Sequence, residues 1–271
     1  MRDAPRFSVI LPTCNRPDML MRAISSVARQ TFSDFELIIV DDGTTPVAQA
    51  MIAHASGGNV RYIRTSGAMG VSVARNRGVA AALGSYLSFL DDDDEYCESF
   101  LEATHNTIRE VGVPCVTWCG AALVDYSESH GGIAKVRMVG APAAGSSFLE
   151  RLDALVGVGI GFGVSIAAAV LKKEGGFDET LHVGSDTDLF LRISGCGTHL
   201  APIDGFHIII HNHSGERLTN PSMDRARADV MRALLQRHSG FLSTCLPIRE
   251  MFLAYARKLE SQSVPMGQNA E

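Results

Sequence analysis

Short apolar runs alternate with amphipathic stretches along the first part of the chain. The runs predict strands at 7–11, 35–40, 60–63 and 86–90. Between them, apolar positions at helical spacing predict helices at about 17–28, 46–55 and 71–83. Asn15 is the expected cap of the first helix, with Pro17 in its first turn. This alternation predicts an α/β fold with a Rossmann-like, mostly parallel sheet and flanking helices.

The pattern is less regular beyond about residue 115. Apolar positions predict helices at 148–155, 185–194, 222–238 and 247–259, and a strand at 206–213. Glycines at 157, 159, 161 and 163 recur with a period of two, which favours an extended strand over a helix. The uncharged run 154–171 just reaches the length of a membrane span, but the glycine period argues against a transmembrane helix.

Composition narrows the class of protein. The chain has 271 residues, 46% of them hydrophobic, and a formal net charge of −6. Lys and Arg form no basic cluster, so nucleic acid is not the expected partner. The six cysteines form no CxxC pair, and Cys115 and Cys119 lie in an apolar run as expected core thiols. Reduced cysteines and the absence of a signal-peptide pattern predict a cytoplasmic protein.

Two acidic clusters follow predicted strands. Asp41 and Asp42 come after the second strand, and Asp91–Asp94, here called the aspartate run, come after the fourth. Ligands of open α/β sheets bind outside the carboxyl ends of the strands, so both clusters are expected in one site. The fingerprints of glycine-rich phosphate loops are missing. A divalent cation that brings a phosphorylated ligand to the carboxylates is therefore favoured.

These acidic and histidine residues also have other interpretations. The spacing of the acidic residues from Asp91 onward fits a calcium-binding loop, except that Tyr96 stands where such a loop needs glycine. The plainest alternative is a run of charged side chains exposed to solvent. His207, His211 and His213 share one face of a predicted strand and could contribute to a zinc site. Asp186 could be a helix cap, as could its neighbour Ser185, or a general base.

Four ordered blocks resemble the family 2 glycosyltransferases of the GT-A fold over about residues 6–220. They are "FSVILPTCNRPDMLMRAISSVARQTFSDFELIIVDDGTT", "GVSVARNRGVAAALGSYLSFLDDDDEY", "GGFDETL" with "SDTDLFLRIS", and "HNHSGERLT". The resemblance implies an inverting, metal-dependent enzyme of bacterial-type polysaccharide or glycoconjugate synthesis. Its donor would be a nucleoside-diphosphate sugar, UDP- or dTDP-linked, and its acceptor a carbohydrate, lipid-linked or other hydroxyl.

The resemblance also implies a role for each matching residue. The nucleotide and donor site would comprise Pro12, Thr13, Asn15, Arg16, Asp41, Asp42, Arg75, Asp91 and Asp92. Among these, Asp41 would accept a hydrogen bond from a pyrimidine N3–H. Asp93 would bind Mn²⁺ or Mg²⁺ together with His213 or, as the alternative, His211. Asp186 would be the catalytic base. The chain departs from the family at Ser185, where a glutamate is usual.

The expected organisation has three parts. Residues 1–115 would bind the nucleotide sugar, 116–220 would form the acceptor-side and catalytic half of the same domain, and 221–271 would hold C-terminal helices and a disordered tail. Contact of the C-terminal helices with a membrane surface is left open. The rival functions are a sugar-1-phosphate nucleotidyltransferase and a catalytically inactive nucleotide-binding module.

Overall fold

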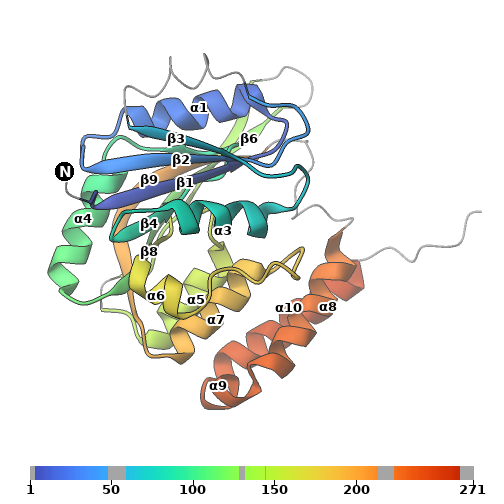
Figure 1. Cartoon of the computed structure of the whole chain (residues 1–271). Coiled ribbons are helices and arrows are strands. Elements are labelled where there is room, and N and C mark those ends of the chain that lie inside the picture. Colours follow the sequence, from blue (N-terminus) through green and yellow to red (C-terminus); the bar gives the residue numbers. More distant parts are fainter. Residues whose placement is uncertain (1–3, 48–58, 128–131, 144, 213–222, 263–271) are drawn as a thin grey trace, which may run out of the picture.

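The computed structural model describes residues 4–47, 59–127, 132–143, 145–212 and 223–262. The strands are β1 (Phe7–Thr13), β2 (Phe35–Asp41), β3 (Val60–Arg64), β4 (Tyr86–Phe89), β5 (Glu95–Tyr96), β6 (Cys115–Tyr126), β7 (Ile133–Val139), β8 (Ser165–Ala167) and β9 (His199–Asn212). The helices are α1 (Pro17–Ala28), α3 (Val71–Ala81), α4 (Phe100–Val111), α5 (Phe148–Val158), α6 (Ala168–Lys173), α7 (Ser185–Gly195), α8 (Asp224–Arg237), α9 (Ser239–Thr244) and α10 (Leu246–Gln262) (Figure 1).

The strands form one mixed sheet in the order β3-β2-β1-β4-β8-β6-β9-β5, with β7 paired to β6. Neighbours among β3, β2, β1 and β4 are parallel, and so is the long β6–β9 pair. The strand β8 runs antiparallel between β4 and β6 and joins the two halves. The predicted α/β fold with flanking helices is confirmed, and antiparallel pairing enters with β5, β7 and β8.

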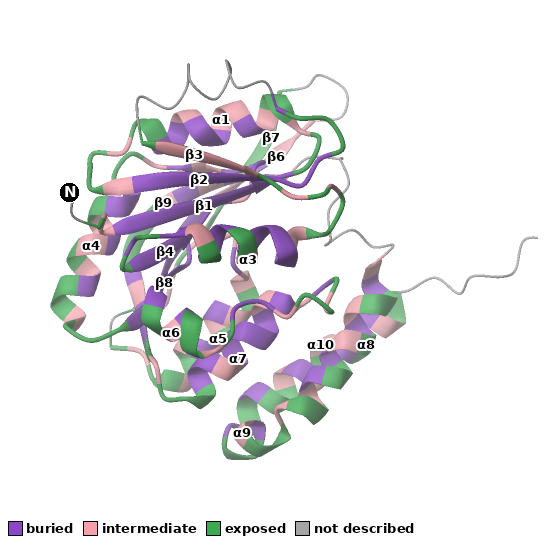
Figure 2. Cartoon of the chain, viewed as in Figure 1, coloured by how far each residue is buried: buried purple, intermediate pink, exposed green. Residues whose placement is uncertain are grey.

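Helices cover both faces of this sheet because successive strand residues point to opposite sides. In β1, Ile10 packs in one core with Ala74 of α3 and with α5 and α7, whereas Val9 packs in the other with Ile24 of α1 and with α4. Figure 2 shows the central strands buried along nearly their whole length. Such burial on both faces explains why the first strands are continuous apolar runs. Cys115 and Cys119 are buried free thiols, as predicted.

The last helices form a separate layer beside α7. Helices α8 and α10 lie side by side, with the short α9 at their turn (Figure 1). Leu234 of α8 and Phe252 of α10 enter the same core as Phe190 of α7. The predicted helices at 222–238 and 247–259 are thus confirmed from Asp224 onward, and residue 222 lies outside the described residues.

Two local predictions are wrong, and a third falls mostly outside the described residues. The strand predicted through the glycines at 157–163 is wrong. Gly157 lies inside α5, and residues 159–163 form a turn in which Gly159 and Gly163 have φ of +74° and +59°. The glycines serve a left-handed backbone, not an extended one. Asn15 is not the cap of α1, because Arg16 holds that position and Asn15 itself has φ of +56°. The helix predicted at 46–55 falls mostly on residues 48–58, which lie outside the described residues.

The uncharged run 154–171 is divided among α5, the turn, β8 and α6. In the part of the chain that the structure describes, none of the helices combines the length and apolarity that a bilayer crossing needs.

Candidate functional site

The carboxyl ends of β1, β2 and β4 lie together at one edge of the sheet. The hydroxyl of Thr13, at the end of β1, donates a hydrogen bond to Asp92 Oδ2 at 2.8 Å. The Asp42 N–H, just after β2, donates to the Thr13 carbonyl oxygen at 2.8 Å. One residue of β1 therefore links both acidic clusters, which lie together at the strand ends as expected.

Asp41 and Asp42 are buried acceptors for the backbone around them. Asp41 Oδ1 accepts from Gly43 N–H at 2.8 Å, and its Oδ2 accepts from Val47 N–H at 3.1 Å and from the Tyr62 hydroxyl. Both oxygens of Asp42 accept backbone N–H groups of the 69–70 segment. In this structure the two carboxylates accept hydrogen bonds from the loops after β2 and β3. The contact of Asp41 with a pyrimidine nucleobase stays a prediction.

Asn15 closes the same loop from the β1 side. Its Oδ1 accepts from the Thr44 N–H at 3.0 Å, which fixes the loop that follows β2. A Cβ on Gly43 would lie 2.7 Å from that Oδ1, so only glycine fits there without movement. Pro12 is buried inside β1 and paired in register with Val40 of β2.

Every member of the aspartate run has a bonded partner, and Asp92 and Asp93 share Arg16. Asp91 accepts from Arg75 Nη2 at 2.7 Å, and Arg16 Nη1 lies 3.3 Å from Asp92 Oδ1 and 3.4 Å from Asp93 Oδ2. Asp94 Oδ1 accepts from the backbone N–H of residue 211 at 3.0 Å. Residues 92–94 are nearly inaccessible, with 3–6% of their surface exposed. The plain solvated charge run is therefore wrong: most of these carboxylates are buried and individually bonded.

The charge on the run is only partly offset by these partners. Burial raises the pKa of Asp92 to about 6, and the neighbouring carboxylates add to this effect, although the Thr13 hydroxyl and Arg16 guanidinium oppose it. A further positive charge at this place would stabilise the ionised form. Oxygen donors of this kind suit Mg²⁺ or Mn²⁺ held by one or two carboxylates together with ligand phosphates. The donor set at Asp92 and Asp93 thus fits the expected cation in its chemistry.

The histidines that the structure describes are not gathered into a site of their own. His211 Nε2 lies 2.9 Å from Glu95 Oε1, and its Nδ1 lies 2.6 Å from the Tyr126 hydroxyl. Burial and the nearby Arg22 guanidinium lower the pKa of His211, so the ring is neutral, with Nε2–H donating to Glu95 and Nδ1 accepting from Tyr126. Within the described ranges no group of three or more His, Cys, Asp or Glu side chains is arranged to hold a metal. His213 lies outside the described residues.

Asp186 lies in the first turn of α7 and faces the glycine turn. Its Oδ2 accepts from the Ile160 N–H at 3.2 Å, and its Oδ1 accepts from the Thr187 N–H at 2.8 Å. The N-cap of α7 is Gly184, so the cap interpretation of Asp186 and Ser185 is wrong. The carboxylate is half-buried.

The turn that holds Asp186 also reaches the aspartate run. A Cβ on Gly159 would lie 2.8 Å from Asp186 Oδ2, and a Cβ on Gly161 would lie 3.1 Å from Asp91 Oδ2. The two carboxylates therefore contact glycines that are two positions apart in one turn. This contact brings the candidate base beside the aspartate run.

Neighbouring contacts join the remaining sequence blocks. Asn76 of α3 donates from Nδ2 to the Phe177 carbonyl oxygen at 2.8 Å and accepts the Phe177 N–H at 2.9 Å. The hydroxyls of Ser72 and Ser185 are 3.0 Å apart and buried, so the residue that departs from the family pattern bonds to α3. The "ARNRG", "GGFDE" and "SDTDLFLR" blocks thus pack directly on one another.

Sequence reasoning missed Arg22 of α1 as part of this region. Its Nη2 donates to the Asp93 carbonyl oxygen at 2.6 Å, and its Nε lies 3.5 Å from Glu95 Oε1. Arg22 and Asp93 are 71 positions apart, so their spacing gives no signal. A basic residue on the helix after the first strand was the only available hint, and it is a weak one.

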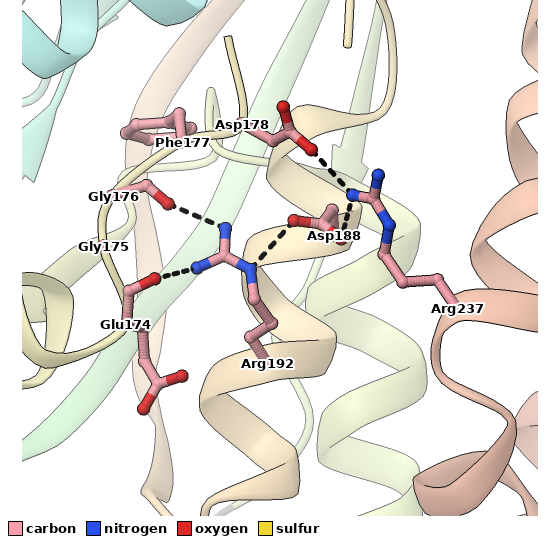
Figure 3. Close-up of a pocket in the computed structure, with 8 residues that line it drawn as sticks. All are labelled: Glu174, Gly175, Gly176, Phe177, Asp178, Asp188, Arg192 and Arg237. Carbon is pink, nitrogen blue, oxygen red and sulfur yellow. Dashed lines mark hydrogen bonds and ion pairs between the residues drawn. The ribbon is translucent and has the colours of Figure 1, made fainter. Parts of the chain in front are cut away.

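A second cluster, centred on Asp188 and also missed, joins α7 to α8 (Figure 3). Asp188 Oδ2 accepts from Arg192 Nε at 2.9 Å, and its Oδ1 accepts from Arg237 Nη1 at 3.1 Å and lies 2.9 Å from His238 Nε2. Burial would raise the pKa of Asp188, but the hydrogen bonds from His238 and Arg192 outweigh it and hold that pKa well below its usual value. A cavity of about 260 Å³ opens here, and it shares no residue with the aspartate run.

Comparison with known proteins places the first half of the chain in a family. Residues 8–131 match the family described as Glycosyl transferase family 2. A PGL/p-HBAD biosynthesis glycosyltransferase of Mycobacterium bovis is 42% identical over 98 residues, 35% of this chain and 38% of that protein. An uncharacterized glycosyltransferase, RT0329, of Rickettsia typhi is 29% identical over 196 residues, 70% of this chain and 60% of that one. The matches thus span between 35% and 60% of the first relatives' own length.

Solved structures agree on the fold. TarS 1–349 of S. aureus, in complex with UDP-GlcNAc, aligns with a TM-score of 0.63 at 19% identity, covering 85% of this chain and 66% of that one. This likeness, over 85% of the chain, assigns the GT-A fold. The family match over residues 8–131, the sequence relatives and the arrangement of the strand-end residues agree in likening this chain to the family 2 glycosyltransferases.

Proposed function

We propose that this chain transfers a sugar from a nucleoside-diphosphate sugar to an acceptor hydroxyl and inverts the anomeric centre. The observation that carries the proposal is the meeting of Asp186 and Asp91 at one turn, which puts a half-buried carboxylate beside a polar strand-end site. Open α/β sheets bind ligands at this edge. The acceptor is a carbohydrate or a lipid-linked hydroxyl in the synthesis of a bacterial polysaccharide or glycoconjugate.

A uridine or thymidine diphosphate sugar is the proposed donor. Solved TarS structures contain UDP and UDP-GlcNAc, which supports a uridine nucleotide for a chain of the same fold. In our proposal residues 1–115 bind this donor, 116–220 bind the acceptor and carry the base, and 221–271 support that second half. Thr13, Arg16 and Arg75 already bond to the aspartate run and would meet the donor there.

Asp93, with His213, is the proposed holder of a Mn²⁺ or Mg²⁺ ion. A bound divalent cation supplies positive charge that stabilises the leaving diphosphate. The chain's own contribution is to fix the carboxylates in advance. Arg16 and the Arg22 bond to the Asp93 carbonyl hold the run in place before any ligand arrives.

Asp186 is the proposed general base. Both of its oxygens accept backbone N–H groups, which fixes the carboxylate plane. From this position it takes the proton of the acceptor hydroxyl while the oxygen attacks the anomeric carbon from the face opposite the diphosphate. One displacement of this kind forms the new glycosidic bond, releases the nucleoside diphosphate and inverts the anomeric centre.

A thermal-shift and calorimetry panel of UDP, dTDP, GDP and ADP, each with and without Mn²⁺, tests the proposed donor. Ligands that bind the native state raise its melting temperature, by an amount equivalent to about 2.7 kcal/mol at a hundredfold excess over Kd. We expect UDP or dTDP to stabilise the chain only when Mn²⁺ is present. Stabilisation by a nucleoside triphosphate, with pyrophosphate release from added sugar 1-phosphate, would instead establish the nucleotidyltransferase. The absence of binding and of a change in melting temperature with every nucleotide of the panel would contradict the proposal.

A further inference from the structure

The turn 159–163 between α5 and β8 touches both functional carboxylates of the proposed reaction. Gly159, with φ of +74°, leaves only 2.8 Å between the place of a Cβ and Asp186 Oδ2. The next residue, Ile160, donates its N–H to the same oxygen at 3.2 Å. Gly161 lies against Asp91, with 3.1 Å between the place of a Cβ and Asp91 Oδ2.

We propose that Gly159 and Gly161 are positioning residues that set the orientation of Asp186 and Asp91. The proposal rests on the proposed function, because it takes Asp186 as the base and Asp91 as part of the donor site. The turn acts through backbone contact: it supplies an N–H to one carboxylate and a surface without a side chain to the other.

Asp186 is held from two separate elements. Thr187 N–H, from its own helix, binds Oδ1 at 2.8 Å, and Ile160 N–H, from the turn, binds Oδ2 at 3.2 Å. The helix alone would leave the carboxylate free to rotate about its side-chain torsions. The bond from the turn therefore selects one orientation, and that orientation decides where an acceptor hydroxyl can deliver its proton.

Asp91 is held between the turn and α3. Arg75 Nη2 donates to Asp91 Oδ1 at 2.7 Å, while Gly161 lies against Oδ2. A methyl group on Gly161 would press on Oδ2 and push the carboxylate along the Arg75 contact. Gly161 has no left-handed backbone, so an alanine there tests the contact without added backbone strain.

Two other glycines of the same segment are matched controls. Nothing lies within 4 Å of a Cβ placed on Gly157, which is inside α5. A Cβ on Gly163 would lie 2.8 Å from Phe100 and 2.9 Å from the Cys119 sulfur, so alanine there strains the apolar core and contacts neither carboxylate. Gly157→Ala and Gly163→Ala thus separate a neutral change and a purely structural change from a positioning effect.

The first measurement uses the ligand-free protein and does not depend on activity. A hydrogen bond to a carboxylate moves an amide proton resonance downfield, so the Ile160 amide reports the contact with Asp186. We expect this resonance to move upfield in Gly159→Ala and in Asp186→Ala. It should stay in place in Gly157→Ala and Gly163→Ala, although the latter lowers the melting temperature. An Ile160 resonance that is unaffected by Asp186→Ala would overturn the contact and the proposal with it.

The second measurement separates kcat from KM with a panel of UDP-glucose, UDP-galactose and UDP-GlcNAc, followed by UDP release. A misplacement of about 1 Å can cost about 10²-fold in rate. Gly159→Ala should lower kcat by about 10- to 100-fold with UDP affinity within about twofold of the unaltered protein. Gly161→Ala should mainly raise KM. If the Ile160 amide resonance moves in Gly159→Ala but kcat is unchanged, Gly159 does not position Asp186 for catalysis and the proposal is refuted. UDP release absent from the unaltered protein would count against the proposed function, while the amide shifts still decide the contact.

Discussion

Thr13, the last residue of β1, donates its hydroxyl hydrogen to Asp92 Oδ2 at 2.8 Å and thereby ties β1 to the aspartate run after β4. The Thr13 carbonyl oxygen at the same time accepts the Asp42 N–H from the loop after β2. The ends of β1, β2 and β4 are thus bonded to one another. Even with these bonds, burial keeps the pKa of Asp92 raised to about 6, so the run still favours a partner of positive charge.

Asp93→Ala is expected to abolish the part of UDP binding that depends on Mn²⁺. The substitution removes the carboxylate that we assign to the cation, and loss of even an outer-sphere partner commonly weakens metal binding by about 10- to 100-fold. UDP affinity in the presence of Mn²⁺ should therefore fall by at least about tenfold, as measured by calorimetry. Affinity without the ion should stay as it was.

Glu98→Ala is the matched control for this loss of charge. Glu98 follows the run in sequence, but its side chain is 68% exposed and pairs with Arg29 at 3.9 Å. Its removal should leave Mn²⁺-dependent UDP binding unchanged. If Asp93→Ala and Glu98→Ala lower the Mn²⁺-dependent affinity for UDP equally, the effect is a general electrostatic one and the assignment of Asp93 as a cation ligand is wrong.

Asp186→Asn should keep donor binding and lose transfer. An amide cannot accept the proton of an acceptor hydroxyl, and loss of a general base typically lowers the rate by about 10²- to 10⁴-fold. The amide also replaces only one of the two carboxylate acceptors that bind Ile160 and Thr187, so melting temperature has to be followed beside kcat. Asp153→Asn, at an exposed position of α5, is the control and should transfer at the normal rate. Near-normal turnover in Asp186→Asn would show that Asp186 is not the general base.

The first four strands and their acidic ends could be predicted because parallel strands buried on both faces are continuous apolar runs. Phe35–Asp41 is buried almost throughout and ends in the acid that the pattern marked. The long strand His199–Asn212 was predicted only in its second part. Its first part contains Pro202 and Gly205, which interrupt the apolar pattern, and its pairing with β6 has register shifts.

The candidate site could be predicted in its residue types but not in its contacts. The carboxylates were found because like charges at a strand end are unusual, whereas their partners come from distant positions: Thr13 and Asp92 are 79 residues apart. The glycines at 157–163 were noticed and assigned to the wrong structure, since their spacing does not reveal a positive φ. The feature of Gly159 that matters is its backbone, which has φ of +74° and lies close to Asp186 Oδ2, and not its place in a period of two.

Gly43→Ala is expected to weaken both stability and nucleotide binding. Its Cβ would lie 2.7 Å from Asn15 Oδ1 and 2.9 Å from Asp41 Oδ1, so the loops after β1 and β2 must separate. Overpacking of this kind costs typically about 1–3 kcal/mol, and the loops involved are those of the proposed nucleotide site. Melting temperature and UDP affinity should fall together.

Gly140→Ala is the control for Gly43→Ala, because nothing lies within 4 Å of its Cβ position. It should change neither quantity. A Gly43→Ala protein that melts and binds UDP like the unaltered chain would show that the loop adapts freely, and would weaken the assignment of Asn15 to the nucleotide site.

Asp188→Asn tests whether the Asp188 cluster stabilises the contact between α7 and α8. Asp188 has a pKa well below its usual value in the folded chain, because hydrogen bonds from His238 and Arg192 outweigh burial. A depressed pKa contributes stability at pH above the unfolded value of about 3.9, and that contribution is lost as the pH falls through this value toward the folded pKa. Removing one partner of a buried charge cluster typically costs about 3–5 kcal/mol.

Denaturant unfolding of Asp188→Asn and of the unaltered chain, from about pH 7 to pH 3, measures this contribution. At pH 7 the variant should be less stable by about 3–5 kcal/mol. The difference should shrink as the pH falls below about 4, because the unfolded chain then takes up a proton at this carboxylate while the folded chain keeps it ionised. Asp229→Asn is the control: Asp229 pairs with Arg225 at 3.5 Å with 59% of its side chain exposed, and should cost less than about 1 kcal/mol at every pH. A stability difference for Asp188→Asn that is the same at pH 7 and pH 3 would mean that packing, not the ionised carboxylate, joins α7 to α8.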